Sequence, residues 1–296
     1  VSFVPPGKKL GEPHTLTARG RTVVLADLKD AAGREQVWQL LDQADVLIEG
    51  YRPGVMERLG FGPDEVLARN PRIVYGRMTG WGQHGPLAQA PGHDLNYIAL
   101  TGALHAIGPK DGAPVPPLNL IGDYGGGSLY LLVGVLAALR EASVSGRGQV
   151  VDAAMTDGAI SLMTNFVSQQ MRGVFSEKRG SNLLDGGAPY YAVYETADGQ
   201  HVTLGAIEPQ FYADFCERVG LPADLRAAQN DRAQWPRMHE EFARIFKGRT
   251  RAEWTALLEG TDVCFAPVLP LSQAQAHPHN RSRGAFVVEV GIHQPA

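Results

Sequence analysis

The chain has few cysteines and no excess of charge of either sign, and each absence excludes a class of protein. Cys216 and Cys264 are its only cysteines, too few for a disulfide framework, so we expect two buried free thiols and a reducing, cytoplasmic location. Lys and Arg number 27 against 31 Asp and Glu, for a formal net charge of −4, which provides no electrostatic basis for nucleic-acid binding.

Long apolar runs are also lacking. None reaches the roughly 18 residues of a membrane helix, so we expect no membrane span. The first six residues, VSFVPP, contain neither a basic nor an apolar segment, so we expect no signal peptide, and the absence of an initiator Met suggests a trimmed start. What remains is the composition of a globular protein, 44% hydrophobic and 20% charged, with 35 glycines for tight turns or close contact with a ligand.

Strand-like and helix-like segments alternate in the first part of the chain. Short β-branched runs at 21–26, 44–49 and 72–78 predict strands, the first of them buried, and the segments between them have helical periodicity. This rhythm predicts a Rossmann-like parallel sheet with helices on its faces. Residues 129–141 are apolar nearly all round and predict a buried helix, with Ser128 as its N-cap.

The composition changes near the middle of the chain. Residues 172–188 are rich in Gly, Ser and charge, as in a linker, and a strand–turn–strand pattern follows at 189–206. Amphipathic helices and a last apolar strand at 264–269 complete the pattern of a small α+β domain. We therefore predict an α/β large domain over 1–188 and a small α+β domain over 189–296.

Two residues have the chemistry of a proton-transfer site. His93 stands where a helix should begin, and the positive end of a helix dipole favours a neutral imidazole, which is a base. Asp123 precedes the run Gly125–Gly127, and a helix start there would direct backbone N–H groups at the Asp123 loop. An imidazole and a carboxylate could serve as two bases. Each residue also has a plain structural interpretation, as a packed or capping His and as a turn Asp, and for isolated residues those are the commoner cases.

Other polar residues give weaker signals. Glu208 follows an apolar strand and could orient a His, or could simply be a charge at a helix N-terminus. The sequence His277-Pro278-His279 lacks neighbouring Cys or carboxylate partners, so we predict no metal site. The loops 50–54 and 79–86 each follow a strand and could hold a phosphorylated cofactor, but neither is a known phosphate fingerprint, so ordinary turns are the preferred interpretation.

Taken together, several motifs resemble the family III CoA-transferase superfamily and, within it, the α-methylacyl-CoA racemases. Their Gly-His-Asp triplet is the most discriminating element, because the transferase branch generally has no His there. The similarity extends from about Arg21 to the C-terminus and rests on these segments: Gly50-Tyr51-Arg52-Pro53-Gly54, Arg77-Met78-Thr79-Gly80-Trp81-Gly82-Gln83, Gly92-His93-Asp94-Leu95-Asn96-Tyr97, Asp123-Tyr124-Gly125-Gly126-Gly127-Ser128, Gly148-Gln149-Val150-Val151-Asp152-Ala153-Ala154-Met155, Gly186-Gly187-Ala188-Pro189-Tyr190-Tyr191 and Ala206-Ile207-Glu208-Pro209-Gln210.

The resemblance implies a reaction, inversion at the α-carbon of 2-methylacyl-CoA thioesters through an enolate. It implies that His93 is the base on one face, that Asp123 is the acid or base on the other, and that Glu208 holds the His. It also implies no metal and no organic prosthetic group, with coenzyme A (CoA) as the carrier part of the substrate. The positions that match CoA-binding segments are Ala26, Asp27, Leu28, Lys29, Gly50, Tyr51, Arg52, Arg58, Gly92, Asp94, Leu95, Asn96 and Tyr97.

The family fold is a large α/β domain and a small domain in an interlocked homodimer that shares its active site between subunits. This sequence departs from it in two places: residues 1–20 do not supply the family's first β-α unit, and the C-terminal extension is short or missing, as expected of a fragment. Two alternatives remain. In a CoA-transferase that moves CoA between carboxylic acids, Asp123 would be a nucleophile that forms an acyl anhydride and His93 would be incidental. A CoA-binding remnant would bind CoA without turnover.

Overall fold

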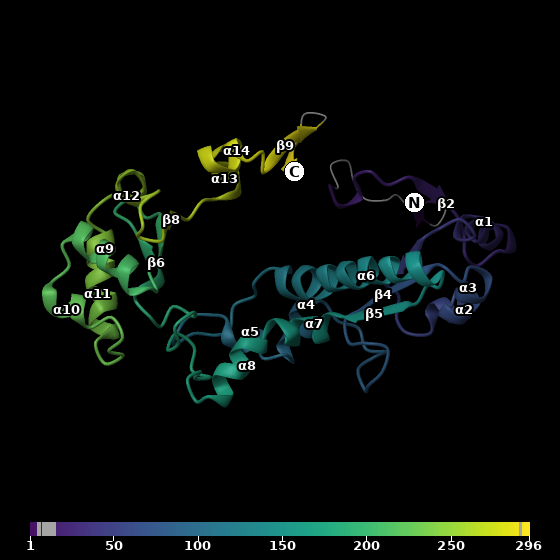
Figure 1. Ribbon diagram of the computed structural model, residues 1–296, viewed down its shortest axis with the longest axis horizontal. Coiled ribbons are helices and arrows are strands. Elements are labelled where there is room, and N and C mark those ends of the chain that lie inside the picture. The colour runs from purple at the N-terminus through teal and green to yellow at the C-terminus, as the bar shows by residue number, and fades with distance from the viewer. Residues whose placement is uncertain (5–6, 8–15, 290–291) are drawn as a thin grey trace. The chain divides into compact units, whose positions relative to one another are not determined.

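The structure is a computed structural model that describes residues 1–4, 7, 16–289 and 292–296, and it divides into two compact units (Figure 1). The first unit contains residues 1–105 and 115–172, and the second contains residues 106–114 and 173–296. The Pro, Gly and polar residues of the stretch 1–20 predict irregular structure, and much of it lies outside the described residues. Its described part contains β1 (Ser2–Val4) and a 3₁₀ helix (Leu16–Ala18), so there the prediction was wrong. Each unit has its own apolar core, so each is described by itself.

A three-stranded parallel sheet lies at the centre of the first unit. Its strands are β3 (Val46–Glu49), β4 (Val74–Thr79) and β5 (Val150–Ala154), in the order β3-β4-β5. Val46 pairs with Val74, and Tyr75 pairs with Val150. The sequence prediction of an α/β fold with a parallel sheet is confirmed.

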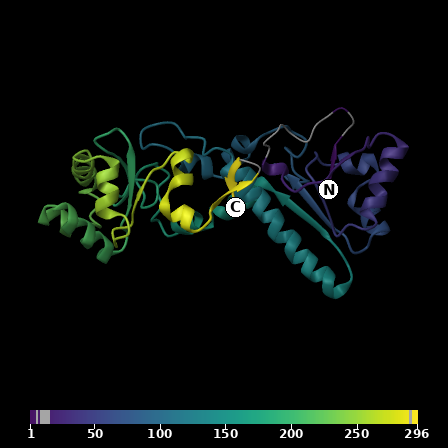
Figure 2. The same cartoon turned by 90° about the horizontal axis from the view of Figure 1, so that it is seen from above.

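Side chains along β4 alternate between two helical layers, as the period of two in a strand requires. One layer is the long helix α6 (Leu129–Ser145), which lies along the sheet in both views (Figures 1 and 2). Its close approach depends on Gly76, where an added Cβ would come within 3.2 Å of Leu131 Cδ1. The other layer surrounds the buried side chain of Tyr75, whose hydroxyl donates to the Phe61 carbonyl at 2.8 Å. That layer consists of α1 (Ala31–Leu41), α2 (Val55–Leu59) and α3 (Pro63–Arg69).

The first predicted strand is not part of this sheet. β2 (Val23–Leu25) pairs in parallel with β1 (Ser2–Val4) in a separate two-stranded sheet. Val23 and Leu25 are 44% and 57% exposed, so the prediction of a buried strand was wrong. A β-branched run favours extended backbone, but burial depends on a covering layer that local sequence does not specify.

The helix that follows Asn119 begins earlier than we predicted. A π-helix, η2 (Leu120–Ser128), continues directly into α6, and the Ser128 hydroxyl donates to the Asp123 carbonyl at 2.7 Å instead of capping a helix. The predicted helix start at Gly125–Gly127 is therefore wrong, because these glycines lie inside η2. They permit close packing against α7 (Met155–Leu162): a Cβ on Gly126 would lie 2.5 Å from the Ala159 nitrogen.

The helix α6 is buried along one stripe only. Leu131, Val135, Ala138 and Ala142 face the sheet, whereas Leu132 and Val133 on the opposite side are 51% and 67% exposed. The prediction of a fully buried helix was wrong for the single chain. Within the part of the chain that the structure describes, the stretch Leu120–Ser145 is the one helix long and apolar enough to cross a membrane, which is weak evidence for a span.

Three further helices are α4 (Asp94–Ala99), which packs against η2, α5 (Ala103–Ala106) and α8 (Thr164–Met171), which follows α7. The sequence from Asp157 to about Met171 predicts one helix, but the structure breaks it at Met163, which is the C-cap of α7 and the N-cap of α8.

The second unit is built on a small antiparallel sheet. The predicted hairpin is formed by β6 (Tyr191–Glu195) and β7 (His201–Gly205), and β8 (Phe265–Pro267) joins β7. Three amphipathic helices fill its core with aromatic side chains: α9 (Pro209–Val219), α11 (Trp235–Phe246) and α12 (Arg251–Leu258). The sequence did not indicate the following elements: α10 (Ala223–Ala227), α13 (Leu271–Ala276), α14 (Pro278–Ser282), β9 (Phe286–Glu289) and β10 (Ile292–Pro295).

The two cysteines differ in exposure. Cys216 is buried in the aromatic core of the second unit, as predicted. Cys264 is exposed, so the prediction that both thiols are buried was wrong. Cys264 lies directly before β8 and has a φ of 55°. It is therefore outside the strand that its apolar neighbours predicted to begin at residue 264.

Candidate functional site

A cavity of about 560 Å³ lies at the carboxyl ends of β3 and β4 in the first unit. This is where ligands bind in open parallel sheets. It is lined by the loop after β3, by the loop after β4 and by the segment before α4. Six of the residues predicted for the site line it together: Gly50, Tyr51, Arg52, Gly92, His93 and Tyr97.

Tyr97 organises one wall of this cavity. Its hydroxyl donates to the Gly92 carbonyl, and its ring meets the Trp81 ring edge-on at a centroid distance of 4.8 Å. Gly80 leaves room for the ring, because a Cβ there would lie 2.0 Å from Tyr97 Cζ. Burial raises the pKa of Tyr97, the charge of Asp123 adds to the shift, and Arg52 opposes it. Tyr97 is therefore a neutral phenol placed within electrostatic reach of both charged residues.

His93 is the N-cap of α4, in extended conformation with φ −133° and ψ 173°. Its backbone N–H donates to Asn96 Oδ1 at 3.1 Å, which fixes the start of the helix. The imidazole lines the cavity and the residue is exposed. A substrate in the cavity can therefore reach the ring.

Asp94 connects this helix to Asp123. It is 5% exposed, and its Oδ2 accepts the backbone N–H of Asp123 at 2.7 Å. Gly122 makes the approach possible, because a Cβ there would lie 2.7 Å from that same oxygen. The Asp123 carboxylate accepts in turn from Asn119 Nδ2 at 3.0 Å. The structure thus connects the start of α4 to the backbone of Asp123 through one buried carboxylate, and Asp123 is not among the residues that line the cavity.

Sequence reasoning assigned Asp94 to CoA binding and missed this link. The only signal in the sequence was the carboxylate of Asp94 next to His93. Nothing in the local pattern indicates that this side chain is buried. The structure gives Asp94 a contact with the backbone of Asp123, 29 residues along the chain, that only packing of α4 against η2 creates.

Glu208 lies in the second unit. It is the N-cap of α9, where its carbonyl accepts from the Tyr212 N–H at 3.0 Å and its side chain makes no capping bond. Its carboxylate is therefore not used by its own helix. The pairing of Glu208 with His93 stays a prediction from the sequence.

The remaining predicted CoA-binding residues do not line the cavity. Asp27 accepts from the Lys29 N–H at 2.9 Å in the turn before α1, where Ala26 and Leu28 also lie. Arg58 lies on α2 near the loop after β3, since a Cβ on Gly54 would lie 3.2 Å from Arg58 Nη1. Leu95 and Asn96 are exposed in the first turn of α4.

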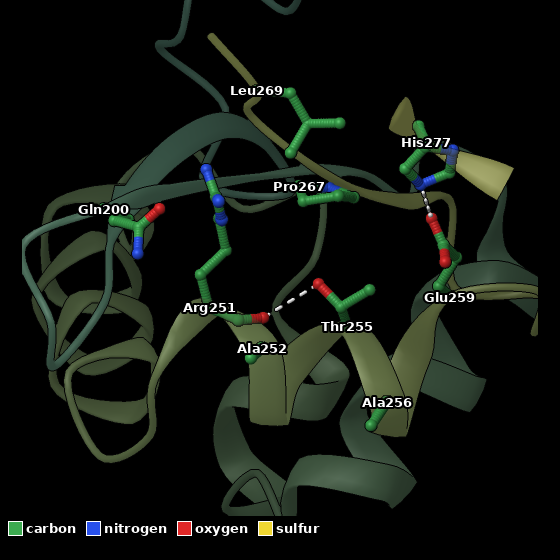
Figure 3. A pocket seen from close by; sticks show the side chains of 9 residues that line it. All are labelled: Gln200, Arg251, Ala252, Thr255, Ala256, Glu259, Pro267, Leu269 and His277. Atoms are coloured by element: carbon green, nitrogen blue, oxygen red, sulfur yellow. Dashed lines mark hydrogen bonds and ion pairs between the residues drawn. The ribbon is translucent and has the colours of Figure 1, made fainter. Parts of the chain in front are cut away.

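A second cavity, of about 570 Å³, lies in the second unit between α12 and the segment after β8 (Figure 3). At one side His277 Nε2 and Glu259 Oε1 are 3.0 Å apart, and at the other Arg251 reaches the Val268 carbonyl and Gln273. None of the residues predicted for the site lines it. Among residues 1–4, 7, 16–289 and 292–296, no group of three or more His, Cys, Asp and Glu is placed to hold a metal ion.

Comparison with known proteins identifies close relatives. The family model of CoA-transferase family III matches residues 4–292. The chain is 44% identical to the α-methylacyl-CoA racemase of Mus musculus over 272 residues, which cover 92% of this chain and 71% of the relative. It is 41% identical to the α-methylacyl-CoA racemase of Homo sapiens over 269 residues, covering 91% of this chain and 70% of the relative.

Solved structures show a similar fold. The crystal structure of Rv3272 from Mycobacterium tuberculosis aligns with a TM-score of 0.79 at 26% identity, covering 99% of this chain and 82% of that one. A protein of the CaiB/BaiF family from Brucella suis aligns with a TM-score of 0.79 at 24% identity, covering 93% of this chain and 74% of that one.

Proposed function

The chain belongs to CoA-transferase family III, and on that premise we propose that it is an isomerase that interconverts (R)- and (S)-2-methylacyl-CoA thioesters. The observation that carries this proposal is the identity of 44% and 41% to two α-methylacyl-CoA racemases over more than nine tenths of the chain. Relatives named as CoA-transferases are less similar: an acyl-CoA transferase of Fusarium pseudograminearum is 34% identical, and a human succinyl-CoA:glutarate CoA-transferase is 28% identical. The transferase alternative is therefore less well supported.

We propose that two groups, His93 and Asp123, transfer the proton. An α-proton next to a thioester is weakly acidic, so its removal needs a positioned base, and such a base contributes roughly 10²–10⁴-fold. In the proposed mechanism His93 removes the proton on one face of the α-carbon and Asp123 returns one on the other. The reverse direction exchanges the two roles. Asp94 Oδ2 accepts the backbone N–H of Asp123. Glu208 is proposed to orient His93.

The enolate oxygen that forms needs preorganised donors. The first backbone N–H groups of a helix have no partner within the helix. We assign this task to the N–H groups of Asp94 and Leu95 at the start of α4, beside the cavity that His93 lines. The sequence suggested N–H groups near Asp123 and at Gly125–Gly127 for this task, but these glycines lie inside η2 and not at a helix start.

Coenzyme A is the proposed carrier of the acyl group. The cavity of about 560 Å³ has the size of a small-molecule site. Arg52 lines it, and a guanidinium is suited to phosphate groups or to stacking on adenine. Lys29 and Arg58 are proposed to serve the same phosphates, and no prosthetic group is needed for the reaction.

We further propose an interlocked homodimer with the active site shared between subunits. The support is the exposed apolar face of α6, where Leu129, Leu132, Val133 and Leu136 are 51–67% exposed. A contiguous apolar face of this kind is typical of a protein interface. A role in lipid metabolism follows from the branched acyl-CoA substrate.

The test is ¹H NMR of a 2-methylacyl-CoA in D₂O with the purified protein. With the wild-type protein we expect loss of the α-proton signal and collapse of the methyl doublet. The His93→Ala and Asp123→Ala variants should not racemise the substrate, because each lacks one of the two bases. Full activity in either variant would refute the assignment. A mixture of acyl-CoA and free acid should show no CoA exchange, and exchange without α-deprotonation would establish the transferase instead.

A further inference from the structure

One guanidinium in the first unit is buried between two carboxylates. Arg77, on β4, places its Nε 2.9 Å from Glu49 Oε1 and its Nη1 2.9 Å from Glu57 Oε1. The side chains of Arg77 and Glu49 are 8% and 3% exposed. Burial disfavours the charge of Arg77, but the hydrogen bonds from Glu57 and Glu49 outweigh it and hold the pKa of Arg77 above its ordinary value. The group is therefore a permanent cation in the interior.

The two carboxylates stand at the two ends of one loop. Glu49 is the last residue of β3, and Glu57 lies in the first turn of α2, so the loop Gly50–Gly54 runs between them. The second oxygen of Glu49, Oε2, accepts the backbone N–H of Tyr51 at 2.7 Å. Arg77 is thus bonded to carboxylates at both ends of the loop, and Glu49 adds a hydrogen bond to the backbone of Tyr51 within the loop.

The ion-pair partners of Arg77 are the two carboxylates that flank the loop Gly50–Gly54. In the sheet register Arg77 is paired with Glu49 on β3 and with Asp152 on β5. Both of its ion pairs are with carboxylates that flank the loop, and burial raises the pKa of Asp152 although Arg77 opposes that shift. The loop is the wall of the cavity that carries Arg52, the exposed cation proposed for phosphate binding.

We propose that Arg77 is a positioning residue for a phosphate-binding loop, which it fixes through Glu49 and Glu57 so that Arg52 and its neighbours are presented to the nucleotide phosphates of an acyl-CoA. This inference rests on the proposed function. It predicts that the Arg77 network acts on affinity for the nucleotide end of the substrate. The chemistry at the α-carbon, which depends on His93 and Asp123, should not depend on it.

The experiment compares two thioesters of the same 2-methylacyl group, one with CoA and one with N-acetylcysteamine, which lacks the nucleotide. In Glu49→Gln, which keeps the size of the side chain, we expect the KM for the acyl-CoA to rise about 10- to 100-fold, the order produced by misplacing a positioning group. The kcat for acyl-CoA and the kcat/KM for the truncated thioester should stay at the wild-type values. Arg77→Lys, which keeps the charge, should have a smaller defect than Arg77→Gln.

The matched control is Arg69→Gln. It breaks an ion pair in the same unit, with Asp42 at 2.6 Å, in which both side chains are 39% exposed and neither lines the cavity. Its KM for acyl-CoA should be unchanged. Circular dichroism and thermal unfolding show which variants are folded, and if the Arg77 variants are not, Glu49→Gln decides the question.

Two results would overturn the inference: an unchanged KM for acyl-CoA in folded Glu49→Gln, or an equal loss with both thioesters, which is the mark of a general structural role. Calorimetric titration with CoA provides a readout without turnover. If the wild type binds CoA but does not racemise, the proposed function fails alone, and the Kd of Glu49→Gln for CoA still tests the network. If the wild type binds no CoA, both proposals fail.

Discussion

Asp94 Oδ2 accepts the backbone N–H of Asp123 at 2.7 Å, and so a buried carboxylate joins the helix that begins at His93 to the π-helix that contains Asp123. The bond is made to the backbone of Asp123, and the Asp123 side chain is bonded instead by Asn119 Nδ2 at 3.0 Å. The geometry of the Asp94 bond sets where Asp123 lies relative to the start of α4, and so relative to His93, the other proposed proton-transfer group.

The first prediction concerns that bond. In Asp94→Ala the N–H of Asp123 loses its acceptor, and we expect α-proton exchange in D₂O to fall about 100-fold, since small misplacements of a catalytic group have effects of this order. Asp94→Asn keeps an oxygen that can accept the N–H, so it should retain more activity than Asp94→Ala. Equal activity in Asp94→Ala and wild type, with both folded, would show that the bond has no positioning role.

The second prediction concerns the close contact between η2 and α7. A Cβ at Gly158 would lie 1.8 Å from the Gly126 carbonyl oxygen, so Gly158→Ala forces the two helices apart. We expect the free energy of unfolding to fall by about 1–3 kcal/mol, as is typical of overpacking. Urea denaturation measures it. Gly205→Ala is the control, because its Cβ would have no neighbour closer than 3.5 Å, and comparable stability in both variants would contradict the prediction.

The third prediction tests the proposed dimer. Val133 is 67% exposed on α6, so Val133→Asp should not disturb the core of the single chain but should weaken association through that face. Sedimentation velocity should show a dimer for the wild type and a shift toward monomer for the variant. Val288→Asp, at a residue of the β9–β10 hairpin that is 58% exposed, is the control. A Val133→Asp dimer as stable as the wild type would place the interface elsewhere.

The fourth prediction concerns the thiols. Burial raises the pKa of Cys216 to about 11, and burial followed by the charges of Glu208 and Asp262 raises the pKa of Cys264. Because the thiolate is the reactive form, alkylation by iodoacetamide at pH 7.5 should be slow and should accelerate as the pH rises toward these pKa values. Mass spectrometry should find the label on the exposed Cys264 alone in the native protein and on both cysteines after denaturation. Labelling of Cys216 in the native state would contradict its burial.

Local signals in the sequence predicted much of the fold. The β-branched runs at 44–49 and 72–78 and the hairpin pattern after residue 189 correspond to β3, β4 and the β6–β7 pair. In these segments the hydrophobic period and the turn residues predict the same element. Both signals are local, so this prediction needs no tertiary information. The same is true of the helix start at His93, which capping geometry favours.

Long-range packing determined the rest. The apolar composition of residues 129–141 predicted burial all round, but the sheet covers one stripe of α6 and leaves the opposite side exposed. The glycines after Asp123 suggested a helix start, but contact with α7 draws them into a π-helix.

The sequence by itself determined which chemical groups this protein has, His93, Asp123 and an arginine-bearing loop after a strand, together with the order of its elements. Only the tertiary structure decided what each group contacts: Asp94 turns inward to Asp123, and Arg77 ties both ends of the loop that carries Arg52. The physical reason is that helical and strand periods are local properties of a chain. A hydrogen bond between residues 29 positions apart depends instead on how whole elements pack against each other.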